Sequence, residues 1–220
     1  MSELLNKFKQ LCNSTITLPD NGEITLSKIN VDFQSKLHNT LGNFTDDNST
    51  IVLKYLQYIN EYIINIDLSR EFTLKDKLWI IHFWRKDIIN TEEELDIESL
   101  KVIDNLKDCT IKFTLNKLET TVKLTQSTLI HENNIIDFLL NQDKELNETD
   151  VLFFDAFRFL DVITIDSKDY KISNLTIEEL YQLYLLFNVD DIKKILQNIN
   201  ITLEDISNIK SIEGDFSSFY

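Results

Sequence analysis

The spacing of apolar residues along the chain predicts a protein built mainly from helices. In most of the sequence, apolar residues recur every three or four positions, as they do along the buried face of an α-helix. Helix-capping residues support several of the starts, including Thr73 with Asp76 and Thr176 with Glu179. The helices predicted in this way cover residues 2–12, 32–41, 51–66, 73–88, 132–140, 149–160 (capped by Thr149) and 176–187, with a last start at Thr202 and Asp205.

Two segments change to strict alternation of apolar and polar residues and predict β-hairpins at about residues 14–27 and 109–126. The turn of the first hairpin contains the only proline of the chain, Pro19, and one of its three glycines, Gly22. The second hairpin turns at Asn116 and Lys117. Because two strands alone are marginally stable in water, we expect the second hairpin to pack on a helix, on the first hairpin or on another chain.

The segment 73–88 has apolar side chains on almost all sides, which predicts a buried helix. Trp79 and Trp84 are therefore expected in the core, and the alternative is an exposed aromatic patch that binds a partner. The whole pattern predicts an α+β fold that is mainly α, with a helical body, two hairpins and a helical C-terminal third. Residues 1–130 would hold the hairpins and a buried helix pair, and residues 131–220 would be helical. The chain lacks a linker rich in Pro, Gly or Ser between these parts, so one continuous domain is the alternative.

Composition excludes several classes of function. With 3 Gly in 220 residues, the chain has no glycine-rich phosphate loop and no nucleophile elbow. A net charge of −15 disfavours nucleic acid and anionic membranes as partners, because both repel an acidic surface. No apolar run approaches the roughly 20 residues that cross a bilayer. These features predict a soluble protein without a leader segment.

The residues that usually perform catalysis or bind metals are scattered. The three histidines, His38, His82 and His131, lack the spacing of a zinc site, and Cys12 and Cys109 form no pair. Adjacent acids such as Asp190 and Asp191 point to different sides of a helix. We therefore expect no catalytic residues, no metal site, no cofactor and no small-molecule substrate.

Both ends of the chain carry apolar residues with little local core to join. Near the N-terminus these lie on the predicted helix 2–12, and near the C-terminus they follow Gly214. We predict that they contact a partner protein. The N-terminal helix could instead pack on the body of the protein, and a C-terminal segment that folds onto its own domain or is frayed is an equal alternative. The predicted contact residues are Leu4, Leu5, Phe8, Phe216, Phe219 and Tyr220.

The order of elements resembles the baseplate hub assembly proteins of T-even-type tailed bacteriophages. The resemblance is carried by the opening hairpin at 17–22, the buried helix at 78–84, the central hairpin at 110–125 and the segment 159–195. In that last segment a helix leads to a short extended stretch, then to a helix with an acidic start, and then to Asp190-Asp191-Ile192-Lys193-Lys194-Ile195. Some relatives carry a cysteine pair at the central turn. This chain has none there, so a metal-stabilised turn is not implied.

The resemblance implies a non-enzymatic component or assembly chaperone of a phage tail baseplate hub. Its partners would be other baseplate or tail proteins, and it would reside in the host cytoplasm during assembly or in the tail of the virion. A second hypothesis is a cytosolic helical adaptor that binds a partner peptide in a groove between its C-terminal helices. A third is an enzyme without recognised motifs, which predicts a deep pocket lined by convergent polar groups.

Overall fold

The computed structural model describes residues 13–27, 31–41, 49–89, 106, 109–115, 117–142 and 144–204. The predicted helix 2–12 and the six predicted contact residues lie outside these ranges. In chain order the elements are β1 (Asn13–Leu18), β2 (Gly22–Ser27), α2 (Val31–Leu41), α3 (Ser49–Ile64), α4 (Leu74–Ile89), β3 (Thr110–Leu115), β4 (Leu118–Leu124), α6 (Leu129–Leu140), α7 (Glu148–Phe157), β5 (Leu160–Ile165), β6 (Lys168–Lys171), the 3-10 turn η2 (Ile172–Asn174), α8 (Ile177–Tyr184) and α9 (Val189–Glu204).

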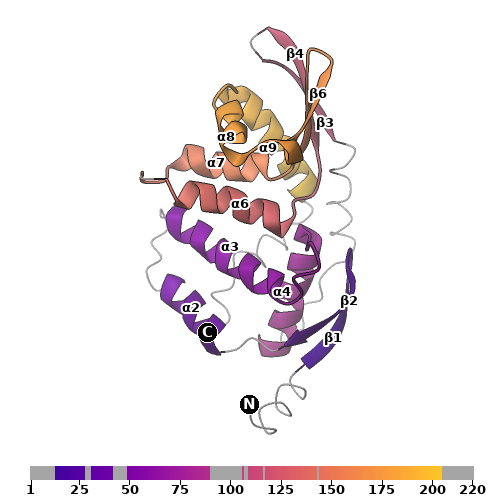
Figure 1. The fold of residues 1–220 in the computed structure, drawn as a ribbon, viewed down its shortest axis with the longest axis vertical. Coiled ribbons are helices and arrows are strands. Elements are labelled where there is room, and N and C mark those ends of the chain that lie inside the picture. The colour runs from indigo at the N-terminus through magenta and orange to yellow at the C-terminus, as the bar shows by residue number, and fades with distance from the viewer. Residues whose placement is uncertain are drawn as a thin grey trace.

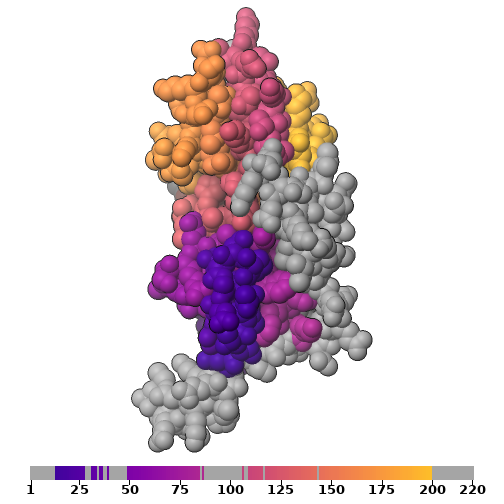
Figure 2. Space-filling view, turned by 90° about the vertical axis from the view of Figure 1, so that its right-hand side faces the viewer, coloured from indigo at the N-terminus to yellow at the C-terminus, as the bar shows by residue number. Residues whose placement is uncertain are grey.

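The helices form a stack along the long axis of the molecule (Figure 1). Helix α2 packs on α3, α3 packs on α6, and α6 packs on both α7 and α8. The two sheets lie along one side of this stack, β1–β2 beside the lower helices and the other strands at the upper end (Figures 1 and 2). The predicted α+β fold, mainly α, is confirmed.

Strands β1 and β2 form the first predicted hairpin, with Asn13 opposite Ser27 and Leu18 opposite Gly22. Gly22 has φ of +68°, a conformation that costs little without a Cβ. The alternation predicted from the sequence places Ile16, Leu18, Ile24 and Leu26 on one buried face. This face packs on the lower helices.

The second predicted hairpin, β3–β4, belongs to a four-stranded antiparallel sheet of order β3-β4-β5-β6. One face of β3 is buried and the other is exposed, as the alternation predicts. The hairpin packs on α9 and pairs through β4 with β5, so its support includes a third hairpin that the sequence pattern did not reveal. This sheet joins residues from both sides of position 130, and all four residues of β6 are exposed on its edge.

Two apolar clusters make up the core. The lower cluster contains the inner face of β1–β2, Phe33 of α2, and residues of α3 and α4. The upper cluster lies between the four-stranded sheet and helices α6 to α9. Helix α6 contributes Leu129 to the lower cluster and Ile135, Ile136 and Leu139 to the upper one.

The two tryptophans of α4 differ in burial. Trp84 is buried with 2% of its surface exposed, and it contacts the rings of Phe33 and Tyr62. Trp79 is half-buried and packs against both apolar clusters. The core placement is therefore confirmed for Trp84, whereas Trp79 lies at the edge of the core.

Three predicted boundaries in the C-terminal part were wrong. Helix α7 is capped by Asn147 rather than Thr149, because the Asn147 side chain accepts from the backbone N–H of Asp150 while the Asp150 carboxylate accepts from that of Asn147. Leu160 begins β5 instead of ending the helix. Thr202 lies inside α9, which starts at Val189 after Asn188 accepts a hydrogen bond from the backbone of Asp191 at 2.9 Å.

Candidate functional site

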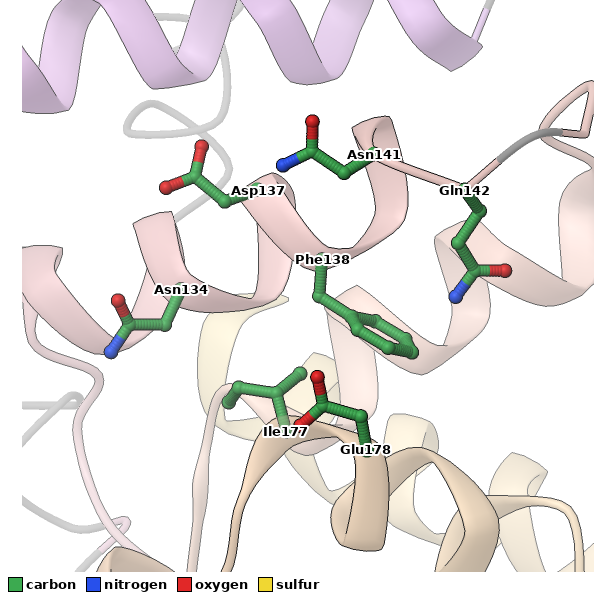
Figure 3. A pocket seen from close by; sticks show the side chains of 7 residues that line it. All are labelled: Asn134, Asp137, Phe138, Asn141, Gln142, Ile177 and Glu178. Atoms are coloured by element: carbon green, nitrogen blue, oxygen red, sulfur yellow. The ribbon is translucent and has the colours of Figure 1, made fainter.

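Two hollows lie on the surface of the C-terminal helices, and they differ in chemistry. The first is a polar pocket of about 470 Å³ between α6 and the start of α8 (Figure 3). The second is an apolar groove of about 250 Å³ between α7, the end of α8 and the first half of α9. Neither lining includes a His, Cys or Ser side chain.

The polar pocket combines amides, carboxylates and one aromatic ring. Phe138 of α6 points toward Ile177 and Glu178 at the start of α8, and its ring also packs against Tyr181 with centroids 5.3 Å apart (Figure 3). Asp137 lies on the side that faces α3. The full lining is Asn134, Asp137, Phe138, Asn141, Gln142, Ile177 and Glu178.

Helix α3 contributes to the electrostatics beside this pocket. The Gln57 side chain donates a hydrogen bond to the Asp137 carboxylate, which links α3 to α6. Partial burial and the nearby charge of Asp137 raise the pKa of Glu61 above its ordinary value. The pocket is therefore suited to hydrogen-bonding groups or a cation, and it would repel a carboxylate.

The apolar groove lies where three elements meet. Helix α7 contributes Leu152, the end of α8 and the following turn contribute Tyr184, Leu185 and Phe187, and α9 contributes Val189, Ile192 and Leu196. Thr149 and Lys193 are its polar members. Its volume is below the range of about 300–1,000 Å³ of typical small-molecule sites, so it suits one or two side chains of a protein segment.

Exposed apolar side chains extend the groove onto the surface. Leu185 and Val189, which line the groove, are 52% and 66% exposed. Single exposed apolar residues are ordinary in proteins, but a patch beside an apolar hollow marks an interaction site. This combination provides an attachment surface for an apolar partner segment.

A polar cluster lies next to the groove residues Thr149 and Tyr184. The buried carboxylate of Asp150 accepts hydrogen bonds from Lys144 Nζ at 2.7 Å and from the Tyr181 hydroxyl at 3.0 Å. Despite the opposing effect of burial, these donors and the backbone of Asn147 lower the pKa of Asp150. The Tyr184 hydroxyl donates to the backbone carbonyl of Thr149 at 2.8 Å. Burial, with nearby Tyr181 and Asp150, raises the pKa of Tyr184 to about 12, so this hydroxyl stays a donor.

Aromatic rings pack against two residues that line the groove, Tyr184 and Phe187. Tyr184 packs against Phe153 and meets Phe157 edge-on, with centroids 5.3 Å apart in both pairs. Phe187 contacts Phe157 and also Phe113 of β3. Packed rings of this kind hold α7, α8 and the sheet in fixed relative positions. The groove is therefore preformed rather than dependent on a ligand.

The strongest charge cluster of the described residues is internal. Glu132 of α6 is fully buried and accepts from Arg158 Nη1 at 3.2 Å and from Asn60 Nδ2 at 3.1 Å. Lys77 Nζ, equally buried, lies 3.5 Å from the same carboxylate. Because the cluster joins α3, α4 and α6 to the end of α7 in the interior, its role is structural.

The histidines and cysteines of the described residues do not gather into a metal site. Among the residues that the structure describes, no group of three or more His, Cys, Asp or Glu side chains is arranged to hold a metal ion. Burial lowers the pKa of His131 despite a hydrogen bond with the Phe157 backbone, and burial raises the pKa of the Cys109 thiol. Both shifts favour the neutral forms.

Sequence reasoning missed the polar pocket and named no residue that lines the apolar groove. It placed partner contacts at the chain ends, which lie outside the described residues, and it offered a groove between the C-terminal helices only as the second hypothesis. One signal for the groove was present: the run Leu183-Tyr184-Leu185-Leu186-Phe187 has more apolar residues than one helix face can bury. The polar pocket has no comparable sequence signal.

Comparisons with known proteins give no match: no family model fits the sequence, and no curated protein or solved structure is significantly similar to this chain. Among the described residues, no helix has both the length and the apolar character needed to cross a membrane.

Proposed function

We propose that the protein is a non-enzymatic component or assembly chaperone of a bacteriophage tail baseplate hub that acts through protein–protein contacts. The observation that carries a binding function is the preformed apolar groove with its exposed rim at Leu185 and Val189. The assignment to a baseplate hub comes from the resemblance in element order. Baseplate or tail subunits are the proposed partners, in the host cytoplasm during assembly or in the virion tail.

Charge would guide the choice of partner. The chain has a net charge of −15, so like-charged surfaces are repelled and basic or neutral subunits are favoured. Burial of a few apolar side chains in the groove would then supply most of the affinity. Charge thus acts on selectivity, and the groove acts on binding strength.

The test is complementation of a phage that lacks this gene. We expect the deletion to reduce the yield of infectious tails, and wild-type protein supplied in trans to restore it. The variant Leu185→Asp/Val189→Asp should fail to restore it, because it places charges in the groove at two exposed positions. Leu186→Asp is the matched control, since Leu186 is equally exposed but does not line the groove. Normal infectious tails from the deletion would disprove the proposal.

The same groove favours one second candidate, a helical adaptor that binds an apolar peptide of a cytosolic partner. Mass spectrometry of purified particles and assembly intermediates separates the two functions. A baseplate component or chaperone is present in at least one of these samples, whereas an adaptor is absent from all of them.

A further inference from the structure

We propose that the apolar groove is occupied by the chain's own C-terminal segment, with the aromatic residues that begin at Phe216 inserted between α7 and α9. Helix α9 supplies one wall of the groove and ends at Glu204, and residues 205–220 follow it in the sequence. These residues include Phe216, Phe219 and Tyr220, which have no apolar neighbours in their own segment beyond three isoleucines.

The segment is long enough to return to the groove. The α9 residues that line it, from Val189 to Leu196, lie about 12–23 Å from the end of α9 along its axis at 1.5 Å per residue. The chain from Glu204 to Phe216 can span up to about 40 Å at roughly 3.3 Å per residue. The aromatic residues therefore reach the groove with length to spare.

Charge favours this hollow over the polar pocket. Asp215 directly precedes Phe216, so a ring in the groove brings this carboxylate toward Lys193, a groove residue. The next residue, Lys194, is also exposed, and its Nζ lies 3.7 Å from Oδ1 of Asp191. The polar pocket instead presents the carboxylates of Asp137 and Glu178, which repel the acidic segment.

Tethering gives this segment an advantage over a free partner. Covalent attachment at the end of α9 produces an effective concentration on the order of millimolar, so even a weak intramolecular contact keeps the groove filled. A partner protein must then displace the segment. This regulatory consequence rests on the proposed function, whereas occupation of the groove does not.

Photo-crosslinking in the full-length chain tests the occupation directly. Phe216 is replaced by p-benzoylphenylalanine (Phe216→Bpa), and crosslinked peptides are identified by mass spectrometry. We expect intramolecular crosslinks to groove residues such as Leu152 and Leu196, with a yield that is independent of protein concentration. The same probe in place of exposed Tyr170 of β6 should give no crosslink to the groove.

Paired variants in the Phe216→Bpa background make the test specific. Leu185→Asp should reduce the groove crosslinks at least fivefold, because Leu185 lines the groove, whereas the neighbouring Leu186→Asp should leave them unchanged. Equal crosslinking in both variants, crosslinks to other surfaces, or none at all would overturn the proposal. Crosslinks between two chains that increase with concentration would also overturn it and identify a second copy as the occupant.

A second measurement separates this proposal from the proposed function. If both hold, Phe216→Ala/Phe219→Ala should increase the capture of purified baseplate subunits several-fold over wild type. If the segment occupies the groove but no subunit binds either form, only the proposed function fails. If wild type and variant capture subunits equally and the crosslinks are absent, only self-occupation fails.

Discussion

Glu132 concentrates the polar chemistry of the interior in one side chain. Its carboxylate is inaccessible to solvent and is satisfied by Arg158, Asn60 and Lys77, which come from three other parts of the chain. Arg158 also lies over the rings of Phe154 and Phe159 at 4.6 and 4.8 Å. Buried ion pairs add little stability relative to apolar packing, but breaking one is costly because the remaining charge stays buried.

The variant Glu132→Gln should lower the free energy of unfolding by about 3 kcal/mol, because Lys77 keeps its buried charge and loses this carboxylate. Urea denaturation at neutral pH measures the change. Glu148→Gln, at an exposed position in the first turn of α7, is the control and should stay within about 0.5 kcal/mol of wild type. Equal effects of the two variants would contradict a structural role for the cluster.

His131 should make stability depend on pH. Burial holds its pKa below the ordinary value of 6.5, so the unfolded chain takes up a proton first as the pH falls. The stability that follows from this lowered pKa is fully present above about pH 6.5, and it is lost as the pH falls toward the pKa of His131 in the folded state. Between pH 7 and pH 5.5, the free energy of unfolding should decrease less for His131→Gln than for wild type. Urea titrations at the two pH values measure this difference. An unchanged slope would argue against a buried neutral imidazole.

At the scale of elements, the first hairpin is attached through its turn. The buried carboxylate of Asp76 accepts hydrogen bonds from the backbone N–H groups of Asp20 and Thr73 and from the Asn21 side chain. Arg70 donates to the backbone carbonyl of Asn21 at 2.6 Å. Asp76, which forms reciprocal capping hydrogen bonds with Thr73 at the start of α4, therefore also fixes the orientation of β1–β2.

Replacing Asp76 should loosen the hairpin before the rest of the molecule. Asp76→Ala leaves three partly buried donors without their acceptor, and we expect a loss of about 2 kcal/mol in unfolding free energy. Hydrogen exchange at the amides of β1 and β2 should accelerate more than exchange in α6. Asp32→Ala, at an exposed site in α2, provides the comparison and should leave the hairpin amides unchanged. Uniform acceleration throughout the chain would contradict local anchoring.

The sequence predicted those elements whose signals are local. Alternating residues around Pro19 and Gly22 predicted β1–β2, and Thr73 and Thr176 predicted helix starts that hydrogen bonds now confirm. The β5–β6 hairpin was recognised only as a short extended stretch because its turn uses Asp166 and Ser167 at φ of +50° and +63° instead of glycine. A search for turns by glycine therefore finds β1–β2 but misses β5–β6.

The candidate site was less predictable than the fold. The groove is assembled from Leu152, the α8–α9 turn and Ile192, which are brought together only by packing. Its distinguishing property, exposure of Leu185 and Val189, depends on how α8 ends and α9 begins. The sequence prediction placed the start of the last helix at Thr202 instead of Val189, because Asn188 was not recognised as a cap. Because of this wrong helix start, the exposed rim of the groove was not predicted.

At the scale of the molecule, α6 connects the two apolar clusters, and the Glu132 cluster lies on the same helix. Neither cluster can lose its packing without displacing a helix that the other requires. We therefore expect a single cooperative thermal transition, with a calorimetric enthalpy equal to the van't Hoff enthalpy. Differential scanning calorimetry provides the check, and two resolved transitions would show that the clusters melt independently.

The edge strand of the four-stranded sheet affects how strongly the protein tends to aggregate at high concentration. Among the strands that the structure describes, β6 ends the sheet, and the outer side of an edge strand can pair with another chain. It is four residues long and fully exposed, and Lys168 and Lys171 stand at its two ends. A short edge guarded by like charges resists addition of a second molecule. These two lysines therefore protect the sheet edge against the addition of strands from other molecules and against fibril growth.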